Sequence, residues 1–278
     1  MRPPGLGQAR RRGVGVEPGV VSLEGMNASS RAQSFDVAAA QYAASRPSYP
    51  AALFDRIEEF AECRLAGARV ADVGAGTGIA TVLLRERGAE VIAVEPGAAM
   101  AGEFHQALPG LPIVRGDGNA LPLAEASCDL ITYAQSWQWT DPGRSVPEAL
   151  RVLRGGGALA IWWNTTAFDV PWIRDQHERI AHHCGVEPRS AVRPPDREAI
   201  RLAGLTGLRV ARRQVRWSRT VSLDTHIANI GSRSAFLVLD EADRHAFLVD
   251  ERERLGKAFP GEEVEETYVV DLLVALRP

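Results

Sequence analysis

Lysine is nearly missing from this 278-residue sequence: Lys257 is the only one, and arginine supplies the rest of the positive charge. We interpret the arginine bias as the mark of a GC-rich genome and not as selection for phosphate binding. The formal net charge is -3. That balance lacks the basic surplus of a dedicated nucleic-acid-binding protein, so we expect no nucleic-acid partner.

Cysteine is also scarce. Cys63, Cys128 and Cys184 are odd in number and widely spaced. This spacing excludes both a disulfide framework and a C-x-x-C zinc site, and it suits a reducing cytoplasm. The histidines of the segment 170–185 contain no i, i+4 pair on a helix, so we expect no metal.

The first 33 residues have no sustained apolar run and are rich in Gly, Pro and Arg, so they are predicted to be a disordered N-terminal extension. No apolar segment follows Arg10 to Arg12, which argues against a signal peptide. Met26 is a plausible start, so it stays open whether residues 1–25 belong to the native protein. The rest, with 45% hydrophobic residues over the whole chain, can bury one α/β core with a cap.

The central motif is VADVGAGTGIAT, residues 70–81. Small and β-branched residues without polar alternation predict a strand that is covered on both faces. Gly74, Gly76 and Gly78 then allow a sharp turn and a close approach to a ligand. The helix that begins at Ile79 would present its N-terminal amides to a carboxylate or phosphate.

The residues that end the next two strands help to identify the ligand. The nicotinamide fingerprint G-x-G-x-x-G needs a third glycine where this chain has Ile79. Glu95 ends a second strand about 20 residues after the first glycine, where a carboxylate accepts both ribose hydroxyls. Asp117 follows a third strand, 112–115, and can accept a hydrogen bond from an adenine amino group. The three strand ends together predict an adenosine site.

At this point the chain resembles the class I S-adenosylmethionine-dependent methyltransferases, in the small-molecule branch of the trans-aconitate and ubiquinone/menaquinone enzymes. The matching pieces are ADVGAGTG, VIAVEP, GDGNALP, CDLITYAQSWQW and ALRVLRGGGALAIWW, and the likeness spans residues 34–278. It implies an α/β fold: a seven-stranded Rossmann-like sheet, mostly parallel with the last strand antiparallel, flanked by helices. A lid helix at 34–45 and cap segments at about 170–205 and 220–260 would complete one methyltransferase domain, 34–278.

The resemblance also implies the site residues. Cofactor contacts are expected from Tyr42, Arg46, Asp72, Gly74, Ala75, Gly76, Glu95, Pro96, Met100, Gly116, Asp117, Gly118, Asn119 and Gln135. Acceptor contacts are expected from Tyr49, Gln138, Trp139, Asn164, Ser232 and Arg233. Catalytic roles fall to Gln135, Trp137 and His226, with His226 as the base if one is needed.

The predicted reaction is methyl transfer from S-adenosylmethionine to a small organic acceptor, with a carboxylate or hydroxyl oxygen as the first choice and S-adenosylhomocysteine as the product. Most of the catalysis could come from aligning the methyl donor with the acceptor and from excluding water from the site. Three alternatives remain: cyclisation or decarboxylation by a cofactor-binding enzyme of this fold, a nicotinamide oxidoreductase, and a non-catalytic binding or regulatory protein. We expect a cytoplasmic monomer or homodimer without a membrane partner; the acceptor, the methylated atom and the pathway stay open.

Overall fold

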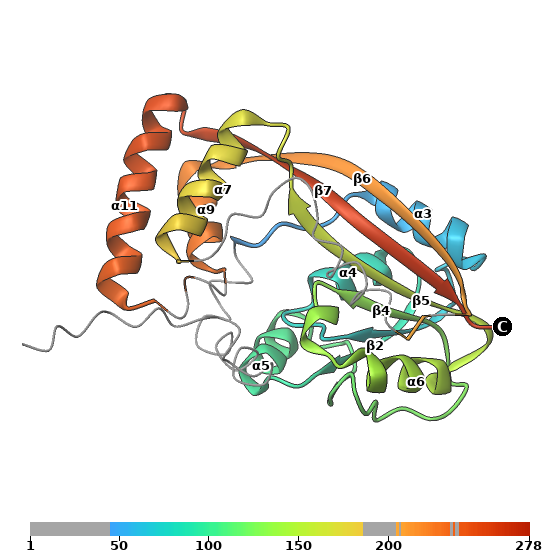
Figure 1. Ribbon diagram of the computed structural model, residues 1–278. Helices are drawn as coiled ribbons and strands as arrows, with labels where there is room; N and C mark the ends of the chain where they lie inside the picture. The colour runs from blue at the N-terminus through green and yellow to red at the C-terminus, as the bar shows by residue number, and fades with distance from the viewer. Residues whose placement is uncertain (1–44, 186–203, 206, 234–235, 237–238) are drawn as a thin grey trace, which may run out of the picture.

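The computed structural model describes residues 45–185, 204–205, 207–233, 236 and 239–278 (Figure 1). The predicted disordered extension lies outside these residues. So do Tyr42, nearly all of the predicted lid helix and part of the first predicted cap segment.

A seven-stranded sheet forms the centre of the protein, in the order β3-β2-β1-β4-β5-β7-β6. β7 runs antiparallel to both of its neighbours, and the other pairs are parallel. This arrangement confirms the predicted sheet and its reversed last strand. The strands are β1 (Arg69–Val73), β2 (Glu90–Glu95), β3 (Ile113–Arg115), β4 (Cys128–Ala134), β5 (Leu153–Thr166), β6 (Arg209–Ser222) and β7 (Glu263–Leu276).

Helices flank the sheet and extend from one end of it. Those in the first half are α3 (Ala51–Ala61), α4 (Ile79–Glu86), α5 (Ala98–Ala107) and α6 (Pro142–Val152), with a short 3-10 turn at Trp137–Trp139. Those of the cap are α7 (Pro171–His183), α9 (Leu223–Gly231) and α11 (Glu241–Ala258). Side-chain caps fix where three helices begin: Asp141 accepts from the Gly143 amide, Ser222 from Thr225, and Asp240 from Asp243.

β5 is longer than the sequence predicted. We expected a strand at 158–163 after a helix stopped by glycines, but β5 begins at Leu153 and includes the glycine run. The pairing of β4 with β5 passes from Cys128 opposite Leu153 to Leu130 opposite Ala158. The extra residues bulge out, and Gly156 takes a φ of +74° there, which glycine adopts readily.

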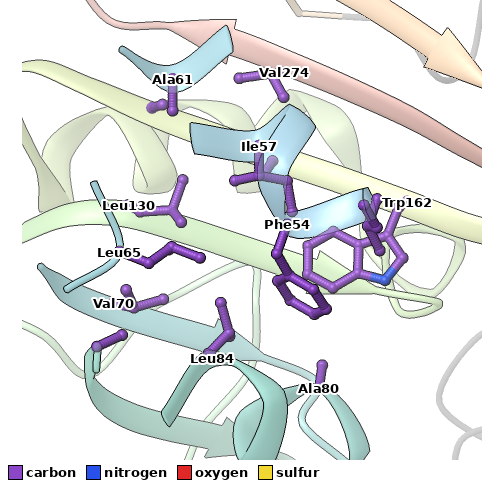
Figure 2. Packing of buried hydrophobic residues seen from close by; sticks show 14 of the residues in the cluster. Phe54, Ile57, Ala61, Leu65, Val70, Ala80, Leu84, Leu130, Trp162 and Val274 are labelled. Atoms are coloured by element: carbon purple, nitrogen blue, oxygen red, sulfur yellow. The ribbon is translucent and has the colours of Figure 1, made fainter. Parts of the chain in front are cut away.

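One face of the sheet is covered by α3 and α4. Phe54, Ile57 and Ala61 of α3 point into a cluster that also contains Leu130 and Trp162 (Figure 2). Trp162 is fully buried, and the rings of Phe54 and Tyr49 meet it edge-on. The amphipathic pattern of residues 51–64 predicts a helix over the first strand; α3 shares its cluster with Val70 of β1 but packs mainly against β5, β6 and β7, where the apolar side chains of the antiparallel half need cover.

The cap lies beyond the carboxyl ends of β5 and β6. Figure 1 shows α7, α9 and α11 together at one end of these long strands, away from α3, α4 and α6. A small core of Ile180, Ile230 and Phe236 holds this part together. Since parallel strands all present their carboxyl ends at one edge, the cap stands on the same side of the sheet as the glycine turn.

Replacing Ile57 by alanine should lower the free energy of unfolding by about 2–5 kcal/mol, because it removes a fully buried side chain and leaves a cavity under α3. Chemical denaturation measures the effect. Val249→Ala on α11, where the side chain is 51% exposed, is the control and should change stability by less than about 0.5 kcal/mol. Equal losses in the two variants would contradict the packing described for α3.

Candidate active site

The chain reverses direction at the carboxyl end of β1 through three glycines with positive φ. A Cβ on Gly74 would lie 2.4 Å from the Cβ of Ser136, so the turn packs against the loop after β4. Gly78, with φ +92°, begins α4, and a Cβ there would lie 2.6 Å from Leu108. A Cβ on Gly76 would meet no atom within 4 Å, so the middle of the turn faces open space.

Asp72 stabilises this turn from beneath. The carboxylate is fully buried and accepts hydrogen bonds from the hydroxyls of Thr81, at 2.6 Å, and Thr132, at 2.9 Å. It therefore connects β1 to α4 and β4. Burial raises the pKa of Asp72, while the two hydroxyls oppose that rise. This geometry makes Asp72 a support of the turn.

Glu95, at the end of β2, connects the turn to the next loop. Its Oε2 accepts from the Gly76 amide at 2.9 Å and its Oε1 from the Gly97 amide at 2.7 Å. The side chain is 7% exposed. Two backbone donors thus hold the carboxylate against the part of the turn that is open to a ligand.

The loop after β3 is shaped by its own polar groups. The exposed Asp117 accepts from the Asn119 amide at 2.8 Å, and the Asn119 side chain accepts from the Asp141 amide at 2.7 Å. Gly118 is buried against Tyr133, whose hydroxyl donates to the Gly118 carbonyl at 3.3 Å. The loop is thereby tied to the start of α6, and the Asp117 carboxylate is left at the surface of the edge.

The loop after β4 contains the predicted amides and indoles. Gln135 adopts a φ of +60°, and its side chain donates to the Asn164 carbonyl at 3.4 Å. The side-chain oxygen of Gln138 accepts from the indole of Trp163 at 2.8 Å. Trp137 is 2% exposed and packs edge-on against Tyr133, so the structure gives it a core position.

A short segment before α3 connects this edge to the cap. The side chain of Asn164 donates to the Ser48 carbonyl at 3.2 Å, and Arg46 donates to the carbonyl of Ser232 at 3.0 Å. Arg219 of β6 donates to the carbonyls of Ser45 and Arg46. The segment 45–48 is therefore held from both sides, and Arg46 lies at the junction of the edge and the cap.

His226 is buried in the cap within a chain of polar groups. Its Nδ1 is 2.7 Å from Glu266 and its Nε2 is 2.9 Å from the Gln176 amide nitrogen. Because the amide nitrogen can only donate, the ring nitrogen Nε2 accepts and Nδ1 donates to the carboxylate. His226 thus links α7 to β7 through both ring nitrogens.

Among the residues that the structure describes, the glycine turn has an unpartnered polar group that suits the predicted cofactor. The Thr77 hydroxyl is buried, and no described residue forms a hydrogen bond with it. An orphaned buried hydroxyl beside the open position at Gly76 and the anchored carboxylate of Glu95 suits an adenosine-containing ligand that carries polar groups on its methionine end.

Comparisons with known proteins agree with this geometry. An uncharacterized methyltransferase of Mycobacterium tuberculosis is 36% identical over 201 residues, which are 72% of this chain and 76% of that protein. The chain belongs to the class I S-adenosylmethionine-dependent methyltransferases. A methyltransferase domain model matches residues 71–161, which run from β1 into β5.

Other methyltransferases are similar over different lengths. A malonyl-[acyl-carrier protein] O-methyltransferase of Methylococcus capsulatus is 30% identical over 222 residues, 75% of this chain and 78% of that one. A candidate type II methyltransferase of Anaeromyxobacter dehalogenans matches in fold with a TM-score of 0.60, at 23% identity, covering 83% of this chain and 97% of that one. No helix in the described part of this methyltransferase is long and apolar enough to cross a membrane.

The structure brings the predicted residues together in two groups. Around the glycine turn lie the predicted cofactor contacts of β1, β2 and β4, with Met100 buried on α5. Around the segment 45–48 lie Arg46, Asn164 and Ser232, while Tyr49 packs against Trp162. Their ligand contacts stay predictions.

Sequence reasoning missed several residues of this region. Thr77 lay inside the glycine motif but was not singled out, although its position between two glycines could have marked it. Glu266, Gln176 and Arg219 carried no local signal, because, apart from Tyr268 beside Glu266, the partners named here are 37 to 174 residues away along the chain.

Stability in acid should depend on Glu266. Burial raises its pKa, but hydrogen bonding from His226 and the positive charge of Arg219 lower it to about 2. Because folding lowers the pKa of Glu266, the ionised carboxylate stabilises the folded state above pH 4.5. This contribution to the free energy of unfolding is lost as the pH falls toward 2. Glu266→Gln should therefore be less stable than wild type at pH 6, by up to about 3 kcal/mol, with a smaller difference at pH 3.

Urea denaturation at several pH values measures this difference. Glu253→Gln is the control, because Glu253 is exposed and forms a surface ion pair with Lys257 one helical turn away; it should change stability little at either pH. A Glu266→Gln deficit that is the same at pH 6 and pH 3 would contradict the assignment.

Proposed function

We propose that this methyltransferase transfers the methyl group of S-adenosylmethionine to an oxygen of a small organic acceptor and releases S-adenosylhomocysteine. The observation that carries the proposal is the glycine turn with Glu95 fixed beside it. An anchored carboxylate at the end of the second strand is placed to accept the hydroxyls of a ribose, and the open space at Gly76 admits the methionine end.

The adenine would lie along the loop after β3. Asp117 is exposed there and can accept a hydrogen bond from the adenine amino group, with Gly118 and Asn119 shaping the loop around it. Pro96 and Gly116, at the ends of β2 and β3, would flank the base. Met100 would contribute apolar contact from α5.

The bound cofactor supplies an activated methyl group, so the residues of this chain have to align the acceptor and exclude water. Gln135, directly after β4, and Asn164, near the end of β5, would orient the acceptor, with Gln138 and Trp139 on the same loop as Gln135. We keep His226 as the candidate base, although its Nε2 would have to exchange the Gln176 amide for the acceptor. An acceptor carboxylate would need no base.

A related protein gives a further reason to prefer oxygen as the methylated atom. The relative from Methylococcus capsulatus, which is similar over three quarters of this chain, is named an O-methyltransferase. We extend that class of reaction, and not its acyl-carrier substrate, to this protein. The protein is proposed to be one methyltransferase domain over residues 34–278, with the cap covering the acceptor.

Calorimetric titration with S-adenosylmethionine and S-adenosylhomocysteine tests the cofactor. The wild-type protein should bind both, and Glu95→Ala should bind about a hundredfold more weakly, because two charge-assisted hydrogen bonds to the ribose are lost. Glu90→Ala, at the exposed start of the same strand, is the control and should bind like wild type. Absence of binding by a folded wild-type sample would refute the proposal.

Glu95→Gln provides a second variant in case Glu95→Ala loosens the turn. The amide keeps the size of the side chain and one acceptor oxygen, so it should bind the cofactor with an intermediate affinity. Circular dichroism and thermal unfolding of each variant separate lost binding from lost folding. Mass spectrometry after incubation with candidate acceptors would then show whether the methyl group leaves the cofactor.

A further inference from the structure

A polar cavity lies in the cap, next to the proposed cofactor edge. The cavity is small and has room for one functional group of a ligand. Thr166, the last residue of β5, forms part of its wall only two residues beyond Asn164. Residues of α7, α9 and β7 complete the lining, among them Trp172, Gln176, His226, Arg233, Glu266 and Tyr268.

The negative charge of Glu266 in this cavity is already satisfied. One of its oxygens accepts from His226 at 2.7 Å and from Asn229 at 3.2 Å. The other accepts from Arg219 at 2.6 Å and from the hydroxyl of Tyr268 at 2.8 Å. Four donors fill the places that a carboxylate offers, so Glu266 has no capacity left for another cation.

The second buried carboxylate of the cap is satisfied in the same way. Glu251 is 1% exposed and pairs with Arg179 through both oxygens, at 2.5 and 2.9 Å. One of these oxygens also accepts from the Gln176 amide at 3.1 Å. Both buried acids of the cap are therefore committed to partners other than Arg233.

Arg233 also lines the cavity, and the Glu266 carboxylate acts on it only from a distance, without a hydrogen bond or ion pair between them. No residue in the described parts of the chain accepts a hydrogen bond from its guanidinium or forms an ion pair with it. Burial lowers the pKa of Arg233 and the nearby positive charge of Arg46 acts in the same direction, while Tyr268 and the Glu266 carboxylate oppose them. A partly buried guanidinium beside a second arginine is unfavourable unless an anion joins it.

We propose that Arg233 binds a carboxylate group of the methyl acceptor in this cavity. This inference rests on the proposed function and narrows its acceptors to small organic acids. The planar fork of a guanidinium matches a carboxylate with two parallel hydrogen bonds. Trp172 and Ile173, which also line the cavity, offer apolar surface to the carbon skeleton next to the acid.

The experiment measures binding of paired ligands by ligand-observed NMR, with and without saturating S-adenosylhomocysteine. The probes are small aliphatic and aromatic carboxylic acids, each paired with its primary carboxamide and its phosphonic acid. In wild type, at least one acid should bind about 10- to 100-fold more tightly than its carboxamide, as expected for charge-assisted hydrogen bonds. Arg233→Gln should remove that preference, and Arg233→Lys should retain part of it.

Arg174→Gln is the matched control, because it removes one positive charge from an exposed position on α7, where the side chain pairs with the adjacent Asp175. It should keep the wild-type preference for acids. The inference is overturned if no acid is preferred over its carboxamide, if Arg233→Gln keeps the preference, or if phosphonic acids alone bind.

The same samples distinguish the two proposals. If S-adenosylhomocysteine binds to wild type and to Arg233→Gln equally but acids show no dependence on Arg233, only the acceptor inference fails. If S-adenosylhomocysteine does not bind to wild type, the proposed function fails, and the arm without cofactor still reports whether Arg233 recognises a carboxylate.

Discussion

The turn between β1 and α4 is the constraint on which the rest of the site depends. The chain must reverse within five residues at the carboxyl end of a buried strand, and it does so with glycine where φ is positive and where Ser136 leaves no room for a Cβ. Asp72 supports the turn from inside the protein and Glu95 holds it from the next strand. Order in the turn therefore requires β2 and β4 to be in place.

A second group of interactions builds the cap from parts that are distant in sequence. β5, β6 and β7 continue past the rest of the sheet, and their ends carry α7, α9 and α11. Buried charge holds these elements together: Glu251 pairs with Arg179 and Glu266 with Arg219. Breaking either pair would leave a buried charge without compensation, which is far more costly than losing a surface ion pair. The segment 45–48 then ties this cap to the cofactor edge.

Local sequence signals predicted the elements best where each element is stabilised within itself. The charged amphipathic pattern of residues 241–258 predicts a helix with the bounds of α11, and the patterns of residues 79–87 and 90–95 predict α4 and β2 to within one residue. The predictions were too short for β5 and β6, because β5 beyond Trp163 and β6 beyond Trp217 are stabilised by pairing with β7, more than 40 residues farther along the chain. The helix predicted over 51–64 ends at Ala61, and its contacts reach β7, which no local pattern could reveal.

The sequence by itself determined the glycine turn, the acidic residues at the ends of β2 and β3, and the resemblance that names the family, because these features depend on residue type and short spacing. Only the tertiary structure decided which charges meet. Trp137 and His226 looked like free reactive groups, yet one is packed in the core and the other has both ring nitrogens hydrogen-bonded. Arg233 is expected from the sequence to contact the acceptor, but only folding shows that both buried acids of the cap form their hydrogen bonds with other partners. Which distant segments form hydrogen bonds and ion pairs depends on how all the helices and strands pack together, so the sequence alone does not reveal these contacts.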